Sequence, residues 1–325
     1  MSAPMSVIGE FDLIARWFTR PARRAALGVG DDCALLNLAP GMQLATSSDM
    51  LVEGRHFLST VAPQRLGHKA LAVNLSDLAA CGAQPLAFTL ALALPRIDEA
   101  FLEGFSRGLL ALADAHGCEL VGGDTTQGPL NLCITVFGEV PPGQALLRSG
   151  AREGDEIWVS GTLGDARLAL EVFRGSVALA GDGFEQVRAA MELPTPRVAL
   201  GTALRGIATS AIDVSDGLLG DLGHILKRSN AGATLQVDAL PRSAVLAAQP
   251  LALQRNCTLA GGDDYELVFT APPSQAAAVR AAAQGAGVAA TRIGRIEPAA
   301  HGLRLVDGDG AAVDQRFAAF DHFKS

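Results

Sequence analysis

Apolar segments with strand-like and with helix-like patterns alternate along the chain, and this alternation limits the folds that it can adopt. Residues 43–47, 85–94 and 130–140 are predicted to form apolar strands, whereas residues 63–81 and 98–116 have the periodicity of helices. A glycine follows each predicted helix directly, as is common where helices end. This mixed order predicts an α/β (α+β layered) fold, in which helices cover sheets.

A polar, glycine-rich stretch near the middle of the chain interrupts this order. Pro141-Pro142-Gly143 and residues 148–155 separate two parts that each contain strands and helices. We therefore predict two domains, residues 1–146 and residues 147–325. In the second domain the pattern predicts strands at 156–160, 265–270, 292–296 and 303–306, and a further strand that ends at Asp213. It predicts helices at 163–173, 196–205, 216–229 and 274–284.

The composition excludes several classes of protein. The 325 residues are 49% apolar and 18% charged, with a formal net charge of −8, so the chain is too apolar to be disordered. Its three lysines, Lys69, Lys227 and Lys324, form no basic run, and nucleic acid is not an expected partner. The longest strongly apolar stretch, residues 86–94, is about half as long as a membrane span, so no membrane partner is expected.

The cysteines and the N-terminal residues predict where the protein works. Cys33, Cys81, Cys118, Cys133 and Cys257 are odd in number and include no C-x-x-C pair. They fit reduced thiols better than disulfides or a Cys/His zinc site. No basic region followed by a long apolar block stands at the N-terminus, so no secretory signal is expected. Together these features predict a cytoplasmic protein.

Aspartates that stand beside glycines carry most of the information about function. A single Gly-Asp is usually a turn, in which the aspartate bonds to its own backbone. Several in one apolar chain indicate carboxylates that converge around a divalent cation, because the cation balances their charge. The segments are GVGDD (28–32), GGDTT (122–126), DVSDG (213–217) and GGDDYE (261–266), with SSD (47–49) and NLSD (74–77) beside them.

Bound magnesium would in turn indicate a phosphate substrate. Mg²⁺ commonly bridges carboxylates to phosphates, so the aspartate segments predict chemistry on nucleotide phosphates. The sequence contains no P-loop, no protein-kinase triplets and no complete dinucleotide-binding glycine pattern. Phosphate contacts would then come from backbone amides and an arginine. Arg148 is the candidate, although a solvated arginine at a domain hinge has the same pattern.

Several single residues have two interpretations. Asp77 lies on an apolar helix and shares a face with Asn74, so it is either a metal ligand or part of an exposed stripe. His56 is either a substrate contact or a structural histidine. Phe320 either packs the C-terminal segment or forms a wall for a flat ligand. Asp31 is either a ligand or a residue that shapes its loop.

Taken in order, the motifs resemble the thiamine-monophosphate kinase family, in the superfamily that includes aminoimidazole-ribonucleotide synthetase and selenophosphate synthetase. The resemblance covers nearly the whole chain, from Gly9 to Phe323. Seven segments in order carry it: GVGDDCALL, SSDMLVEGRHF, KALAVNLSDLAACGA, LVGGDTTQGPL, LLRSGAREGD, AIDVSDGLLGDLGHIL and GGDDYELVFT.

The resemblance implies an enzyme that transfers the γ-phosphoryl group of ATP directly to thiamine monophosphate. It also implies several Mg²⁺ ions, often with K⁺, a homodimer of N-terminal domains, and substrates bound between the two domains. The acceptor is already an anionic phosphate, so we assign no general base. Asp124 and Asp213 are expected to bridge the metal ions to phosphate.

The resemblance also implies roles for particular residues. Asp264 stands where the family often has glutamate, Ser48 where it often has threonine, and Phe320 where it commonly has tyrosine or tryptophan. The implied Mg²⁺ ligands are Asp32, Ser47, Ser48, Asp49, Asp77, Asp124, Asp213 and Asp216. The implied ATP contacts are Gly123, Asp124, Arg148 and Ser215, and the implied contacts with thiamine monophosphate are His56, Asp264 and Phe320.

Other functions remain as alternatives. An aminoimidazole-ribonucleotide synthetase would use formylglycinamidine ribonucleotide instead of thiamine monophosphate. A non-catalytic protein would bind Mg²⁺ and ATP with the same loops but release no ADP. Selenophosphate synthetase and a hydrogenase-maturation relative are disfavoured, because the sequence has neither a cysteine near its N-terminus nor one at its C-terminus.

Overall fold

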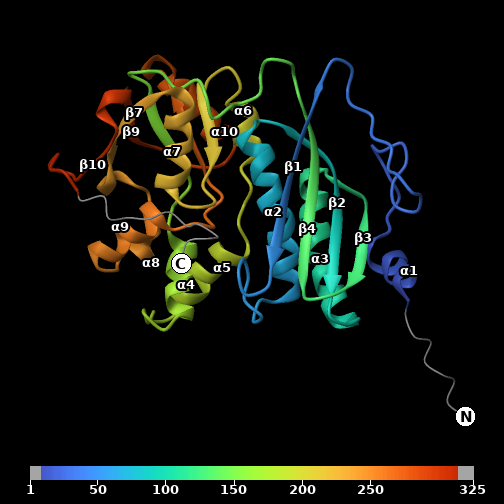
Figure 1. The fold of residues 1–325 in the computed structure, drawn as a ribbon. Helices are drawn as coiled ribbons and strands as arrows, with labels where there is room; N and C mark the ends of the chain where they lie inside the picture. Colours follow the sequence, from blue (N-terminus) through green and yellow to red (C-terminus); the bar gives the residue numbers. More distant parts are fainter. Residues whose placement is uncertain (1–8, 314–325) are drawn as a thin grey trace, which may run out of the picture. The chain divides into compact units, whose positions relative to one another are not determined.

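The structure is a computed structural model that describes residues 9–313 of the chain (Figure 1). The chain divides into two compact units, and each is described by itself. The first unit comprises the chain up to Asn74 together with Pro85–Glu139, and the second comprises Leu75–Gln84 together with the chain from Val140. Helix α2 (Pro63–Ala80) contributes to both units.

The first unit contains a four-stranded sheet in the described part of the chain, with the strand order β1-β4-β2-β3. Strands β2 and β3 run parallel, and β1 and β3 are the two edges. The strands are β1 (Gln43–Val52), β2 (Gln84–Leu94), β3 (Glu119–Gln127) and β4 (Asn131–Val140).

Helices α2 and α3 (Glu99–His116) lie behind this sheet in Figure 1, and the short helices α1 (Glu10–Leu13) and η1 (Ile14–Phe18) precede it. The backbones of α2 and α3 approach closely, since a Cβ added at Gly108 would lie 1.8 Å from the carbonyl oxygen of Gln64. Local signals define α3 at both ends. The carboxylate of Asp98 accepts the N–H of Phe101 at 3.0 Å, and Gly117 ends the helix with φ of 59°.

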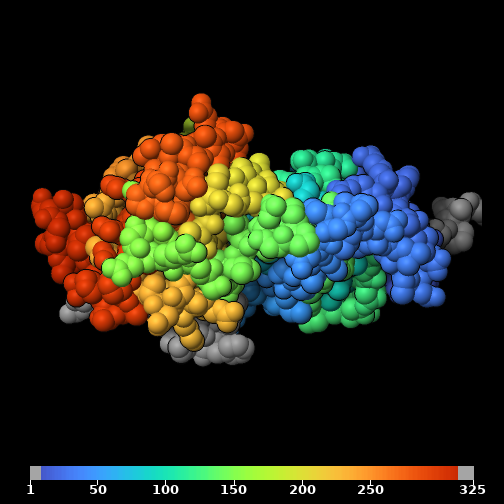
Figure 2. Space-filling view, turned by 90° about the horizontal axis from the view of Figure 1, so that it is seen from above, coloured from blue at the N-terminus to red at the C-terminus, as the bar shows by residue number. Residues whose placement is uncertain are grey.

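Strand β1 has two different faces. Leu51 is 4% exposed, whereas Leu44 and Met50 are 50% and 56% exposed. Because successive side chains of a strand point to opposite faces, Leu44, Ser48 and Met50 share an outer face that leaves apolar side chains in solvent. Figure 2 shows the blue N-terminal part of the first unit at the molecular surface.

The second unit contains a six-stranded sheet, again counted over residues 9–313, with the order β10-β7-β9-β5-β8-β6. Strands β10 and β7 pair in parallel, and the other pairs are antiparallel. The strands are β5 (Glu156–Ser160), β6 (Ser210–Asp213), β7 (Ala231–Gln236), β8 (Leu267–Ala271), β9 (Ala290–Pro298) and β10 (Leu303–Val306).

The core of the second unit forms where α7 (Leu218–Ser229) packs on this sheet. Leu222 and Ile225 of α7 are fully buried with Ile157, Val159 and Val268 of the strands. Burying each such side chain contributes about 1.5–3 kcal/mol, so this layer holds the strand ends in place. The other helices are α4 (Asp165–Phe173), α5 (Gly183–Glu192), α6 (Val198–Ala203), α8 (Ala244–Ala247), α9 (Leu251–Ala260), α10 (Ala276–Gly285) and the short η2 (Val237–Ala239), η3 (Pro273–Gln275) and η4 (Ala299–His301).

The structure confirms the α/β class, and it also contains elements that the sequence patterns did not predict. Helix α5, strand β7 and the helices α8 and α9 were not expected. The GGDTT segment forms no turn, because Gly123 and Asp124 lie inside β3. Gly123 has φ of 147°, and a Cβ there would lie 1.9 Å from the carbonyl oxygen of Leu90 in β2. The close backbone approach therefore requires glycine inside the strand.

Candidate active site

Two of the aspartate segments lie side by side in the second unit. Strands β6 and β8 are antiparallel neighbours, so the end of β6 lies next to the start of β8. The N–H of Asp263 donates to the carbonyl of Ser215, and the N–H of Tyr265 donates to the carbonyl of Val214, both at 2.8 Å. This edge of the sheet therefore brings together four of the predicted site residues: Asp213, Ser215, Asp216 and Asp264.

Asp213 ends β6 in a buried position. Its side chain is among the buried polar groups, with 5% exposed, and its Oδ2 accepts a hydrogen bond from the hydroxyl of Ser76 at 2.8 Å. Ser76 lies in the part of α2 that belongs to the second unit and is 0% exposed. Ser76 was not among the predicted site residues, although it lies in the NLSD segment. This hydrogen bond fixes the direction of a predicted metal ligand.

Asp221 is a second residue that the sequence analysis did not select. One oxygen, Oδ2, accepts the backbone N–H groups of Ser215, Asp216 and Gly217, each at 3.1 Å. Burial and the nearby carboxylate of Asp216 raise the pKa of Asp221 to about 7, against the three hydrogen bonds, which lower it. A signal was present in the sequence, since an acidic residue in the first turn of a helix suits the positive helix end.

Asp264 lies in the other loop at this end of the strands and is half-buried. Its Oδ1 accepts the N–H of Gly164 at 2.8 Å, whereas its Oδ2 is buried without a hydrogen-bond partner among the described residues. Burial raises the pKa of this carboxyl well above its usual range, and the charges of Glu266 and Asp165 add to the increase. Oδ2 is therefore an acceptor or proton site that a ligand could satisfy.

The backbone around Asp264 is strained. Asp263 and Tyr265 have φ of 65° and 51°, in the left-handed region that non-glycine residues rarely adopt. A residue held in such a conformation costs on the order of 1–3 kcal/mol and persists only where its surroundings impose it. The two main-chain hydrogen bonds to Val214 and Ser215 impose it here.

A buried ion pair supports the segment that follows. Arg197 Nε donates to Glu266 Oε2 at 2.7 Å, and a second guanidinium nitrogen bonds the other carboxylate oxygen. The hydroxyl of Ser160 also donates to Glu266 at 2.5 Å and accepts the N–H of Leu267 at 2.9 Å. These contacts tie the end of β5 to the start of β8. None of these residues was predicted, because the pairing of β5 with β8 joins positions far apart in sequence.

In the first unit, β1 places its three predicted ligands on two faces. Ser47 and Asp49 share one face by strand periodicity, and Ser48 points to the other. The hydroxyls of Ser48 and Thr135 lie 2.9 Å apart and share a hydrogen bond. The N–H of Asp49 donates to the side-chain oxygen of Asn74 at 3.1 Å, which fixes the backbone beside the Asp49 carboxylate.

His56 follows directly after β1 in a tight turn. Its Nδ1 accepts the N–H of Val52 at 3.0 Å, so the neutral ring carries its proton on Nε2. The ammonium group of Lys69, which is 2% exposed, donates to the carbonyl of His56 at 3.2 Å. The contact with Val52 orients the ring and the contact with Lys69 holds the backbone of the turn, so Lys69 is another positioning residue that the sequence analysis did not assign.

The remaining predicted residues lie at separate places. Asp32 is exposed, and its N–H donates to the Asp31 side chain at 3.0 Å, so Asp31 shapes this loop. Asp124 is exposed on β3, Asp77 is half-buried on α2, and the side chain of Arg148 is exposed. Phe320 lies outside the described residues.

The predicted metal ligands are divided between the two units. Within residues 9–313, no group of three or more His, Cys, Asp or Glu side chains is arranged so that it could hold a metal ion. Asp49 and Asp124 lie on the two edge strands of one sheet, three strand spacings apart, or about 14 Å. The donors themselves suit Mg²⁺, because they are carboxylate and hydroxyl oxygens.

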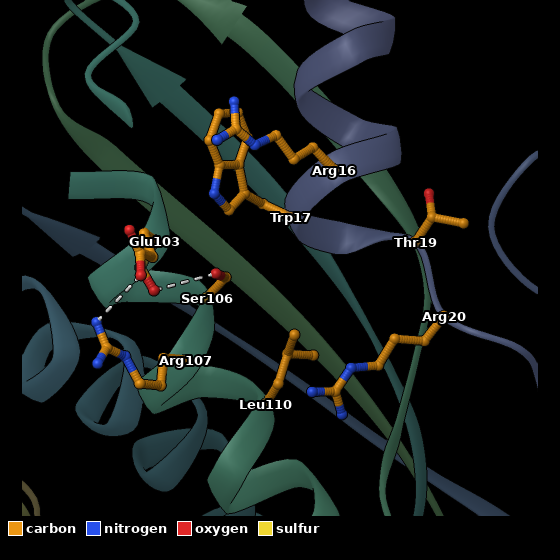
Figure 3. Close-up of a pocket in the computed structure, with 8 residues that line it drawn as sticks. All are labelled: Arg16, Trp17, Thr19, Arg20, Glu103, Ser106, Arg107 and Leu110. Carbon is orange, nitrogen blue, oxygen red and sulfur yellow. Dashed lines mark hydrogen bonds and ion pairs between the residues drawn. The ribbon is translucent and has the colours of Figure 1, made fainter. Parts of the chain in front are cut away.

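A cavity in the first unit lies apart from all predicted residues. It has a volume of about 420 Å³ and lies between η1 and α3 (Figure 3). Its arginines are neutralised, since Arg16 pairs with Glu99 at 2.8 Å and Arg20 pairs with Asp114 at 2.9 Å. Arg107 also lies 3.8 Å from Glu103. This cavity therefore lacks the unpaired charge that a phosphate site needs.

Comparison with known protein families gives the class of the protein. The AIR synthase related protein N-terminal domain matches residues 30–140, and the corresponding C-terminal domain matches residues 152–306. The chain is thus a two-domain protein of the AIR synthase related class. Two hydrogenase maturation protein structures with 21% and 22% identity and TM-scores of 0.75 and 0.77 share this fold.

More similar relatives define the family within this class. Thiamine-monophosphate kinase of Salmonella typhimurium is 47% identical over 97% of this chain and 98% of its own length. The enzyme of Haemophilus influenzae is 43% identical over 98% of both. The crystal structure of thiamine-monophosphate kinase from Stenotrophomonas maltophilia has 46% identity and a TM-score of 0.83, and the match covers 93% of this chain and 95% of that chain. The chain belongs to the thiamine-monophosphate kinase family and is an enzyme of that kind.

A structure described as "AaThiL complexed with AMPPCP and TMP" is also similar. It has 29% identity and a TM-score of 0.76, and the match covers 88% of this chain and 89% of that chain.

No helix among the described residues is both long enough and apolar enough to cross a membrane.

Proposed function

We propose that this enzyme transfers the γ-phosphoryl group of ATP to thiamine monophosphate, giving thiamine diphosphate and ADP. The observation that carries the proposal is the set of near full-length matches to thiamine-monophosphate kinases, one of them at 47% identity. A related structure holds AMPPCP, an ATP analogue, together with TMP. The adjacent loops after β6 and before β8 would supply polar groups for both kinds of ligand.

The transfer is direct and in line, without a covalent enzyme intermediate. The acceptor phosphate is already an anion, so its repulsion from the γ-phosphate is the main obstacle and no general base is needed. Catalysis then consists of positioning and charge stabilisation. The fixed carboxylate of Asp213, oriented by Ser76, supports this role, because its direction is set before a ligand arrives.

Several Mg²⁺ ions, and K⁺ where it is used, would be held by oxygen donors of this chain. When bound, they supply the positive charge that lowers repulsion between the two phosphate groups. We assign them to the hard oxygen donors of Asp32, Ser47, Asp49, Asp77, Asp124, Asp213 and Asp216. Ser48 would take part only through its backbone carbonyl, because its hydroxyl lies on the other face of β1 and bonds to Thr135.

The substrates would contact a different set of side chains. Gly123, Asp124, Arg148 and Ser215 are assigned to ATP. His56, Asp264 and Phe320 are assigned to thiamine monophosphate. Two observations support the second set: His56 carries its ring proton on Nε2, and Asp264 has a buried oxygen without a partner among the described residues.

We infer that the enzyme works as a homodimer in the cytoplasm. The outer face of β1 supports the dimer, since Leu44 and Met50 leave half or more of their surface exposed, and a second copy of this face would cover them. Sedimentation of the wild type and of Met50→Glu tests this. We expect a dimer that the charged side chain dissociates, and a monomeric wild type would refute it.

The reaction itself is tested by measuring ADP release from Mg-ATP with and without thiamine monophosphate, with the product identified by mass. We expect one thiamine diphosphate for each ADP, and no product after chelation of the metal. ADP release that requires formylglycinamidine ribonucleotide instead would identify a synthetase. Binding of ATP without any ADP release would identify a non-catalytic protein.

A further inference from the structure

The loop that carries Ser215 and Asp216 is closed around a carboxylate of the chain itself. Three successive N–H groups, of Ser215, Asp216 and Gly217, point at the single oxygen Oδ2 of Asp221, each at 3.1 Å. Successive N–H groups that converge in this way form a concave site for an anion, of the kind that often binds phosphate. Here Asp221, which is 3% exposed, already fills that site.

This arrangement determines which atoms of the loop face a ligand. The three N–H groups are occupied, so the loop has only its side chains and carbonyl oxygens left for binding. The side chains of Ser215 and Asp216 are half-buried, whereas Asp221 is buried beneath them. The same loop is held from its other side by the N–H groups of Asp263 and Tyr265, which donate to the carbonyls of Ser215 and Val214.

We propose that Asp221 is a positioning residue for the phosphoryl-transfer site, which holds the Ser215–Gly217 backbone so that Ser215 and Asp216 face the nucleotide. This inference rests on the proposed function for the identity of the ligand. We assign Asp221 itself no contact with either substrate, because the residue is 3% exposed and its Oδ2 is occupied by the three N–H groups.

The test compares Asp221→Ala and Asp221→Asn with a matched control. Asp155 provides the control, because it is 4% exposed and also closes a turn, accepting the N–H of Arg152 at 2.9 Å and the hydroxyl of Thr209 at 2.7 Å. Asp155 precedes β5 and Thr209 precedes β6, whereas Asp213 ends β6. This turn therefore lies at the opposite end of the strands from Asp213. Asp155→Ala therefore measures the effect of losing a buried aspartate that closes a turn away from the candidate site.

Binding of Mg-AMPPCP, measured by calorimetry, is the first readout. We expect Asp221→Ala to weaken it by about tenfold or more, since three N–H groups lose their acceptor and the loop loses its fixed geometry. Asp221→Asn keeps an oxygen that can accept these bonds and should lose much less. Asp155→Ala should bind the analogue as the wild type does.

Amide hydrogen exchange is the second readout, and it does not depend on turnover. We expect faster exchange at residues 215–217 in Asp221→Ala, with exchange in β5 and β8 unchanged. The inference is wrong if Asp221→Ala binds Mg-AMPPCP like the wild type, or if Asp155→Ala loses the same affinity. If Asp221→Ala does not fold, Asp221→Leu, which also lacks an acceptor, takes its place, and unchanged affinity of that variant would overturn the inference.

The two proposals fail in different ways. If the proposed function is wrong, the wild type forms no thiamine diphosphate. If only the inference about Asp221 is wrong, the wild type turns over normally and the Asp221 variants bind the analogue as the wild type does.

Discussion

Two aspartates at one end of the strands of the second sheet, the buried Asp221 and the half-buried Asp264, differ in how their oxygens are satisfied. A single oxygen of Asp221 accepts three backbone N–H groups. Asp264 accepts one, from Gly164, and its other oxygen has no partner among the described residues. Burying a polar atom without a hydrogen bond costs about 1–3 kcal/mol, so the chain tolerates at Asp264 a cost that it avoids at Asp221.

This difference separates two roles. The loop closed by Asp221 is complete without a ligand, and it presents the groups that we assign to ATP and metal ions. The loop of Asp264 retains an unsatisfied oxygen and two residues in the left-handed region, which is typical of a site whose geometry serves a ligand. The first loop should therefore control the rate, and the second should control recognition of the acceptor.

The largest expected effect comes from Asp213, at the start of the first loop. We expect Asp213→Asn to lower kcat by about 100- to 1000-fold, because loss of one charge-stabilising group typically has this size. The measurement is thiamine diphosphate formation at saturating Mg-ATP. Asp155→Asn is the control and should keep normal turnover, because Asp155 precedes β5, at the opposite end of the strands from Asp213. Near-normal turnover of Asp213→Asn would remove the distinction between the loops.

A smaller effect is expected at Asp264, and it should fall on KM for thiamine monophosphate instead of kcat. Asp264→Asn should raise KM for thiamine monophosphate by about 10- to 100-fold, since a site built to pair with a ligand rejects the mismatched partner. The affinity for Mg-AMPPCP should stay unchanged. Asp263→Asn is the matched control, because asparagine also tolerates the left-handed conformation. An equal loss of nucleotide affinity would show that both loops serve ATP.

The stability of Asp264→Asn should depend on pH. The pKa of Asp264 is raised in the native state, so between about 4, the usual value, and this raised value the native state binds more protons than the unfolded state. The carboxyl therefore lowers stability increasingly as pH rises above about 4. We expect the free energy of unfolding of the variant to exceed that of the wild type by about 1–3 kcal/mol at pH 8 and to equal it near pH 4. Urea unfolding measures this, and a difference independent of pH would contradict it.

The smallest effect is expected at Ser76, which orients Asp213. Ser76→Ala removes one hydrogen bond of 2.8 Å, worth about 1 kcal/mol, so we expect kcat to fall by about threefold to tenfold. Ser106→Ala, in the other unit, is the control and should leave kcat unchanged, because its hydroxyl bonds only the carbonyl of Glu103 among the described contacts. A kcat of Ser76→Ala equal to that of the wild type would show that Asp213 needs no support.

Local sequence patterns were sufficient to predict a helix or strand wherever the segment carries its own start and stop signals. The helix expected at residues 98–116 is α3, capped by Asp98 and ended by Gly117. The strands expected at 156–160 and 303–306 are β5 and β10. Strand β3 was missed because Gly123 and the following threonines interrupt its apolar pattern, and only the partner backbone of β2 explains the glycine.

The arrangement of the site depends on pairings that the sequence does not display. Ser215 and Asp263 are neighbours because β6 pairs with β8, and Asp49 and Asp124 are separated because β1 and β3 are edge strands. Asp221 is different, since it lies only four residues after Gly217. A search for an acceptor of the loop N–H groups would have found it in the sequence.

The cysteines offer a way to observe one predicted metal ligand directly. Cys33 is exposed and adjoins Asp32, whereas Cys118 and Cys257 are buried and burial raises the pKa of each thiol to about 12. Since the thiolate is the reactive form, a maleimide dye at neutral pH should modify Cys33 well before the two buried thiols. A fluorophore attached there would report cation binding beside Asp32 through its emission, in the absence of any turnover.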